Sequence, residues 1–243
     1  MNDTHLVIGA GQVGQAIAAV LECDLIDVHT EEDYGEEHAV IHICFPFGET
    51  FVDDVRYYAR IHRAETVVVH STVPVGTCDP CGWVHSPVRG RHPDLEEGVR
   101  TFTKVFASSD MESVLQAAEP FAVAGVKVDL WPNARASELA KLLELAELGA
   151  AVRIQKEMKH LCDEHGVPFE LVYTRMRQQY NRGYVELGET RFVKPVLGWT
   201  PGPLGGHCVA QNTPLLDSDF FEDLVYPISP DGWDDANRIG RLS

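Results

Sequence analysis

The chain is poor in basic residues, with 20 Lys and Arg against 37 Asp and Glu in 243 residues and a formal net charge of −17. Such a charge excludes nonspecific attraction to nucleic acid and to anionic membranes, since both carry negative charge themselves. The chain also lacks an apolar run long enough to span a bilayer, and it lacks a basic stretch followed by a signal-type apolar core. We therefore expect a cytoplasmic protein that binds neither nucleic acid nor a membrane.

Cysteine is sparse: the six cysteines are scattered, and several lie inside apolar runs where a free thiol behaves as a small hydrophobe. This pattern suits a reducing compartment. Cys78-Asp79-Pro80-Cys81 has the spacing of a metal or redox motif, but no second cysteine pair accompanies it, so we predict no metal site. Internal repeats and low-complexity tracts are absent, and 44% hydrophobic residues allow one substantial core or two modest ones.

A glycine fingerprint stands near the N-terminus, where the apolar run 5–8 leads into Gly9-Ala10-Gly11-Gln12-Val13-Gly14 and then into the helical pattern 15–21. In dinucleotide-binding units the first glycine makes the turn, the second admits the pyrophosphate, and the third lets the helix pack on the strand. This context of strand, turn and helix predicts a dinucleotide site at Gly9, Gly11, Gln12, Val13 and Gly14.

Asp27 follows a second apolar run, at the place where a carboxylate bonds the ribose hydroxyls of an adenine dinucleotide. No arginine follows closely to receive a 2′-phosphate, so NAD is favoured over NADP. The alternative is a turn or cap residue, because Asp24, Glu31, Glu32 and Asp33 crowd the same region.

Two further buried strands are expected at residues 39–46 and 66–70, with a helix over 51–64 between them. A usual Rossmann unit has room for one more strand and helix before residue 39, so this domain is interpreted as abbreviated. Ligands of an open α/β sheet lie beyond the carboxyl ends of its strands. We therefore predict that Pro46, Ser71 and Thr72 contact the cofactor, and that Thr72 also reaches a substrate or water.

A long helix is expected from Ser137, as its N-cap, to His165. An apolar stripe at helical spacing follows this helix and indicates a core or dimer face. The stripe consists of Leu139, Leu142, Leu143, Ala146, Ala150, Ile154, Met158 and Leu161.

A second glycine-rich stretch, Pro201-Gly202-Pro203-Leu204-Gly205-Gly206-His207-Cys208, lies late in the chain. Glycine lets bare backbone approach a ligand closely, and a reactive thiol at Cys208 could meet that ligand. The alternative is a tight surface turn beside an ordinary small apolar residue.

These stretches together resemble the UDP-glucose/GDP-mannose dehydrogenase family. They are the glycine fingerprint, Ser-Thr-Val-Pro-Val-Gly-Thr at 71–77, and Gly-Gly-His-Cys at 205–208, a form closest to the UDP-N-acetylmannosamine dehydrogenase branch. The segment 137–144 also resembles the family's Ala-Glu-x-x-Lys-Leu helix. The resemblance reaches to about Leu216, with gaps. It implies an NAD cofactor, a small-molecule substrate and a homodimer formed through the 137–165 helix.

The resemblance also implies a chemistry. In the family a cysteine attacks a sugar aldehyde made by a first hydride transfer, a second transfer gives a thioester, and water releases the acid. Cys208 aligns with that nucleophile, Lys141 with the lysine that steadies the oxyanions, and Thr72 with a water-orienting threonine. Gly205, Gly206, His207 and Asn212 are placed at the substrate.

Three positions depart from the family pattern: an asparagine is Leu145, the Ser-Pro-Glu carboxylate is Val88, and an aspartate after the cysteine is Asn212. Loss of both carboxylates removes plausible general bases for thioester hydrolysis and argues against a full four-electron oxidation. Glu144 and His207 are candidate substitutes, although a solvated helix face and a turn are the stronger interpretations of these two residues. The family's C-terminal nucleotide-sugar domain is expected to be missing, so a smaller substrate or a partner subunit is implied.

Arg89, Arg91 and His92 form a basic cluster in an acidic protein, which could grip a phosphate or carboxylate of the substrate. The alternative is solvated loop charges.

We predict an α/β protein, with an abbreviated Rossmann-type parallel sheet domain over residues 1–132 and a mainly helical substrate and dimerisation domain over 133–243. The leading hypothesis is an NAD-dependent oxidoreductase acting on a hydroxyl or aldehyde of a small polar, perhaps sugar-like, substrate. The alternatives are an NAD-binding protein whose catalysis has decayed, and a lyase or epimerase that holds NAD as a resident cofactor.

Overall fold

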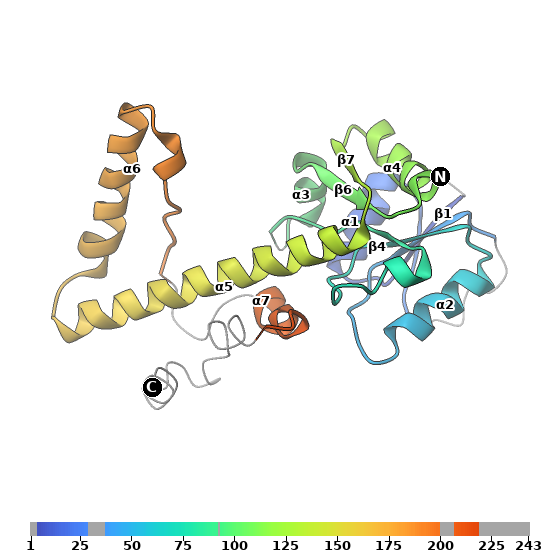
Figure 1. Ribbon diagram of the computed structural model, residues 1–243, viewed down its shortest axis with the longest axis horizontal. Helices are drawn as coiled ribbons and strands as arrows, with labels where there is room; N and C mark the ends of the chain where they lie inside the picture. Colours follow the sequence, from blue (N-terminus) through green and yellow to red (C-terminus); the bar gives the residue numbers. More distant parts are fainter. Residues whose placement is uncertain (1–3, 29–36, 92, 200–206, 219–243) are drawn as a thin grey trace. The chain divides into compact units, whose positions relative to one another are not determined.

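The computed structural model describes residues 4–28, 37–91, 93–199 and 207–218 (Figure 1). The chain divides into two compact units, residues 1–142 and 143–243. This division falls inside the long helix α5 (Ala134–Glu164), whereas we placed a domain boundary before that helix, at residue 132. The first turns of α5 pack with the sheet, which is why they count with the first unit.

The first unit is built on a seven-stranded sheet of order β2-β1-β3-β4-β5-β6-β7. Its strands are β1 (His5–Ile8), β2 (Asp24–Ile26), β3 (Val40–Ile43), β4 (Thr66–Val69), β5 (Val84–His85), β6 (Lys104–Ala107) and β7 (Val128–Trp131). This Rossmann-type sheet, followed by a mainly helical part, confirms the predicted α/β fold.

The sheet is not parallel throughout, because β5 pairs with β6 in the antiparallel sense, with His85 opposite Ala107. The chain between these strands forms only α3 (Leu95–Thr101) and returns to the sheet at the edge where β5 ended. We call this edge, where β1, β3, β4 and β5 end, the carboxyl edge. The predicted Rossmann-type parallel sheet is therefore mostly parallel, with one antiparallel pair at β5 and β6.

The abbreviation is visible at the other side of the sheet. A full dinucleotide-binding sheet continues beyond its second strand with a third. Within the described residues the sheet ends at β2, and β3 pairs directly with β1, Leu6 lying opposite Ile41.

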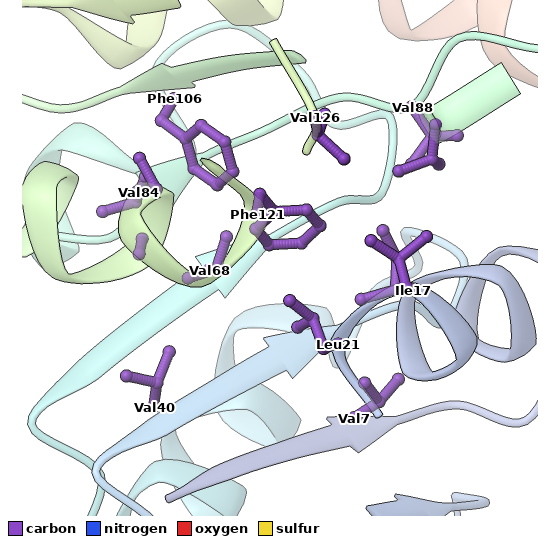
Figure 2. Close-up of a cluster of buried hydrophobic side chains, with 14 of the residues drawn as sticks. Val7, Ile17, Leu21, Val40, Val68, Val84, Val88, Phe106, Phe121 and Val126 are labelled. Carbon is purple, nitrogen blue, oxygen red and sulfur yellow. The ribbon is translucent and has the colours of Figure 1, made fainter. Parts of the chain in front are cut away.

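Side chains alternate between the two faces of the sheet, as the strand repeat requires. One face packs under α1 (Gln12–Leu21), α3 and α4 (Met111–Val123), where Val7, Val40, Val68 and Phe106 belong to the same buried cluster as Phe121 of α4 (Figure 2). The other face packs under α2 (Phe51–Ile61) and the start of α5. The two hydrophobic clusters thus hold the sheet between layers of helix (Figure 1).

Helix α5 begins at Ala134, so the prediction that Ser137 is its N-cap was wrong. The Ala136 N–H donates to Asn133 Oδ1 at 3.3 Å, and the Ala134 N–H donates to Asp79 Oδ1 at 3.2 Å. These two side chains accept the free N–H groups of the first turn. Asp79 lies in the short 3₁₀ helix Asp79–Cys81, far away in sequence, so local pattern could not identify it.

The apolar stripe of α5 does not form one buried face. Leu142, Ala146 and Ala150 are buried, whereas Leu143 and Ile154 are 38% and 50% exposed. Helix α6 (Met176–Glu186) follows a π-helical turn over Glu170–Arg175, and it buries none of its residues. The second unit is completed by short turns over Thr190–Phe192 and Thr213–Leu215 and by α7 (His207–Asn212).

Helix α6 ends at Glu186. Gly188, at φ +74°, supplies the left-handed residue that ends it.

Candidate functional site

The glycine loop joins β1 to α1 at the carboxyl edge, and its three fingerprint glycines have different surroundings. Gly9 has φ +107°, and a Cβ there would lie 2.9 Å from the Cys44 carbonyl carbon. A Cβ on Gly14 would lie 1.9 Å from the Gly9 carbonyl oxygen. Close packing of the chain on itself therefore requires glycine at both positions.

Gly11 differs, because a Cβ built on it meets no protein atom within 4 Å. The protein's own packing does not require a glycine at this position, whereas a ligand lying against the loop would. Gly11 is also the N-cap of α1 and offers no side-chain hydrogen bond to the first turn. Gly11 and Gln12 are both exposed, and the first N–H groups of a helix have no partner within the helix. This is the geometry that an anionic pyrophosphate needs.

Asp27 follows β2 and lies beside the glycine loop. Its Oδ1 accepts the N–H of Ala10 at 3.1 Å and the N–H of Val28 at 2.9 Å, while the residue is exposed. The carboxylate is thus held next to the turn that carries Gly11. Its two roles from sequence, turn residue and ribose partner, are compatible in this geometry.

The loops that leave β3 and β4 are tied together at the same edge. The Ser71 hydroxyl donates to the carbonyl of Phe45, next to the exposed Pro46, and Thr72 is half-buried. Ser71 therefore has a structural partner, while contact of Pro46, Ser71 and Thr72 with a cofactor remains a prediction.

Glu138 anchors the β4 exit loop, a role that the sequence did not reveal. This carboxylate on α5 is completely buried, and it accepts the N–H of Gly76 at 2.5 Å and the N–H of Cys78 at 2.8 Å. Ser137, the residue before Glu138, is also buried, and its hydroxyl lies 2.7 Å from Nδ1 of His85. The residues on either side of this polar pair, Ala136 and Leu139, are exposed, so no local pattern signalled that Ser137 and Glu138 are buried.

Lys141 also lies on this first part of α5. Its ammonium donates to the carbonyl oxygen of Val88 at 3.1 Å, across from the exit of β5. The Val88 side chain is buried in the hydrophobic cluster under α1 and α3 (Figure 2). The position that carries a carboxylate in the resembled family is therefore core here, and only its backbone faces Lys141.

Of the basic cluster, Arg91 pairs with Asp94 at 3.2 Å on the surface, where its charge is largely screened. Arg89 is half-buried, and His92 lies outside the described residues. Recognition of a phosphate or carboxylate by this cluster remains a prediction.

In the second unit, Cys208 lies on α7 and packs with Val209 against Leu145, Ala150 and Val152. The Asn212 side-chain amide donates to the Cys208 carbonyl at 2.8 Å, so Asn212 closes the end of α7. Gly205 and Gly206 lie outside the described residues, as does the side chain of His207, and Glu144 is exposed. Lys141 and Cys208 belong to different units, and their meeting remains a prediction.

No family model matches the sequence, and no curated protein matches it significantly. Solved structures do match. The UDP-N-acetyl-mannosamine dehydrogenase Cap5O from S. aureus matches with a TM-score of 0.58 at 16% identity, over 91% of this chain and 65% of that chain. A UDP-glucose dehydrogenase from Pyrobaculum islandicum matches with a TM-score of 0.58 at 15% identity, over 76% and 64%.

A 3-hydroxyisobutyrate dehydrogenase from Mycobacterium tuberculosis matches with a TM-score of 0.55 at 17% identity, over 73% of this chain and 71% of that chain. At these identities the similarity shows the fold. The chain spans about two thirds of the length of the two nucleotide-sugar dehydrogenases.

Two features are absent from the part of the chain that the structure describes. No helix there is long and apolar enough to cross a membrane. No group of three His, Cys, Asp or Glu side chains there has the arrangement to hold a metal ion.

Proposed function

We propose that the protein is an NAD-dependent oxidoreductase. The observation that carries the proposal is the space at Gly11, which no protein atom fills, beside the first turn of α1 and the Asp27 carboxylate. Gly11 and the N–H groups of that turn would hold the pyrophosphate, and Asp27 the adenosine ribose. NAD supplies a hydride acceptor when bound. The named dehydrogenases of similar fold support the same class of reaction.

The substrate is proposed to be a small polar molecule, sugar-like in character, whose hydroxyl or aldehyde is oxidised. Cys208 would be the nucleophile and Lys141 the cation that stabilises a developing oxyanion, with Thr72 orienting water. Arg89 and Arg91, with His92, would bind an anionic group of the substrate. The buried side chain of Val88 and the structural bond of Asn212 argue against a full four-electron oxidation, since neither residue can act as the general base for thioester hydrolysis.

Gly11→Val tests the cofactor site. We expect NADH affinity to fall by more than tenfold, because the added side chain fills the space of the pyrophosphate, while the thermal midpoint changes little. NADH fluorescence titration and thermal unfolding measure the two effects. Gly183→Val is the matched control, since its Cβ also meets no atom within 4 Å. Equal NADH affinity in wild type and Gly11→Val would contradict the proposal that the cofactor binds at Gly11.

A second candidate, an NAD-binding protein without oxidation chemistry, is favoured by the packing of Cys208 against an apolar cluster. The alkylation rate of Cys208 against pH, with and without NAD, separates the two functions. Cys208→Ser subtracts the other five thiols. An enzyme should show fast alkylation of Cys208 at a rate that NAD alters. A slow thiol indifferent to NAD assigns the protein to the second candidate.

A cytoplasmic homodimer formed through α5 belongs to the same proposal. Its support is the set of apolar side chains that α5 leaves exposed, among them Leu148 and Ile154.

A further inference from the structure

A row of polar side chains crosses the buried face of the sheet that α4 covers. His5 Nδ1 lies 3.0 Å from His42 Nε2, and His42 Nδ1 lies 3.0 Å from His70 Nε2. His70 Nδ1 lies 3.2 Å from the Lys104 ammonium. His42, His70 and Lys104 are buried, and three adjacent imidazoles linked nitrogen to nitrogen make one continuous hydrogen-bonded chain.

This hydrogen-bonded row of side chains runs from the carboxyl edge of the sheet to the opposite, amino edge. Lys104 begins β6, which is antiparallel to β5, so it lies at the carboxyl edge with His70, the residue after β4. His5 begins β1 and lies at the opposite edge. There it lines a cavity of about 680 Å³ together with Glu22, Arg100 and Glu119.

Lys104 lies on a small cavity of its own at the carboxyl edge. This cavity, of about 10 Å³, is lined by Val88 and Arg89 and has about the space that one water needs. The Lys104 ammonium donates to the Ser86 carbonyl at 3.0 Å, and Lys141 donates to the Val88 carbonyl two residues later. Lys104 therefore lies at the same loop as the proposed catalytic lysine.

The hydrogen bonds of His70 near Lys104 permit two tautomeric states of the three histidines. The Ser86 carbonyl lies 2.7 Å from His70 Nδ1, so Nδ1 donates to it when protonated. When Lys104 is an ammonium that donates to Nδ1, the proton of His70 is on Nε2 instead. Each neighbour must then follow, because Nε2–H of one ring donates to Nδ1 of the next.

We propose that His70, His42 and His5 form a proton relay that joins Lys104 at the carboxyl edge of the sheet to the cavity at its amino edge. In one passage Lys104 gives a proton to His70 Nδ1, and His70 passes its Nε2 proton to His42 Nδ1. His42 passes its Nε2 proton to His5 Nδ1, and His5 releases its Nε2 proton to the cavity. One proton leaves Lys104, one emerges at His5, and every ring ends as the neutral Nδ1–H form.

The surroundings of Lys104 favour such an exchange. The ammonium has no carboxylate partner within the part of the chain that the structure describes, and it lies over the rings of Phe106 and Phe121. The pKa of Lys104 is lowered to about 7, mainly by burial; Cys44 acts in the opposite sense, and the nearby charge of Lys141 adds to the lowering. A lysine in this range gains and loses its proton near neutral pH.

The histidines of the relay have their own charged neighbours. Burial lowers the pKa of all three, well below the usual range at His42 and His70. His38 acts on His5, and His85 acts on His70, both in the same direction. The neutral rings are therefore the resting state, and a proton crosses them without staying.

Oxidation of a hydroxyl to a carbonyl releases a proton with each hydride transferred. This use of the relay rests on the proposed function. The relay would draw that proton from the carboxyl edge and deliver it to the amino edge. The geometry of the chain does not depend on that reaction, so the two can be tested separately.

Nitrogen NMR of protein labelled with ¹⁵N-histidine tests the relay without substrate or cofactor. We expect His5, His42 and His70 to change from the Nε2–H to the Nδ1–H form together, with one shared midpoint near pH 7. In Lys104→Met all three should stay Nδ1–H at every pH, because no ammonium donates to His70. In His42→Phe, the tautomer of His70 should still change with pH, whereas the tautomer of His5 should not.

His62→Phe is the matched control, because His62 is also a fully buried histidine but lies outside the chain. It should leave the shared transition unchanged. Three histidines that keep one form across this range, or that change at separate midpoints, would overturn the relay. Failure of NADH to bind would overturn the proposed function and leave this result untouched.

Discussion

Glu138 shows how one residue can set the shape of a loop at the candidate site. Its carboxylate accepts two backbone N–H groups of the loop that carries Ser71 and Thr72, and all of these atoms lie within the first unit. A buried carboxylate held this way has two charge-assisted bonds that a neutral amide cannot reproduce, since the NH₂ of glutamine would face an N–H.

Glu138→Gln should lower the free energy of unfolding by about 2–3 kcal/mol, the cost of leaving one buried N–H without an acceptor. Urea denaturation measures it. Glu147→Gln, on an exposed part of the same helix, is the control and should stay within about 0.5 kcal/mol of wild type. Equal losses in the two variants would show that the loop does not depend on the carboxylate.

At the scale of elements, α5 leaves several apolar side chains exposed among the described residues. Leu148 and Ile154 are about half exposed, whereas the neighbouring Gln155 and Lys156 are buried. Gln155 donates to the carbonyl of Leu197 at 3.0 Å, which explains the burial of one polar residue on the helix. Helix α5 thus leaves some apolar side chains exposed while it buries polar ones.

Ile154→Glu should convert a dimer into a monomer, because a charge placed in an apolar contact must be desolvated. Light scattering coupled to size-exclusion chromatography measures the mass. Gln178→Glu adds the same charge on the exposed surface of α6 and should leave the mass unchanged. A wild-type protein that is already monomeric would refute the dimer.

At the scale of the whole molecule, buried histidines make stability depend on acid. His42, His70 and His85 are all buried, and burial holds each pKa below its usual range, that of His85 at about 3. The unfolded chain binds protons at these residues below pH ~6.5, while the folded chain does not. Stability from this source is complete above pH ~6.5 and is lost as the pH falls.

Between pH 7 and pH 5 we expect the free energy of unfolding to fall by about 6 kcal/mol, close to 2 kcal/mol for each of the three histidines. Urea denaturation at a series of pH values measures the slope. His42→Phe should reduce the slope by about a third, and His165→Gln, exposed at the end of α5, should leave it unaltered. A slope indifferent to His42 would contradict the burial of a neutral ring.

The sequence determined the elements whose signals are local. The glycine fingerprint predicted β1, the turn and α1, because the constraints on Gly9 and Gly14 arise within a few residues or at the adjacent strand. Strand runs and the α/β class followed from apolar patterning for the same reason. Asp27 was placed at the dinucleotide site by its position directly after the second apolar run.

Only the tertiary structure decided which distant polar groups meet. His5 and His42 are 37 residues apart, and Gly76 and Glu138 are 62 apart, so no spacing rule joins them. Sheet register brings the histidines together, and the return of the chain at the carboxyl edge makes β6 antiparallel and puts Lys104 at their end. The pattern along the chain determines the local secondary structure. Strand pairing across the sheet determines which buried polar side chains come within hydrogen-bonding distance of one another.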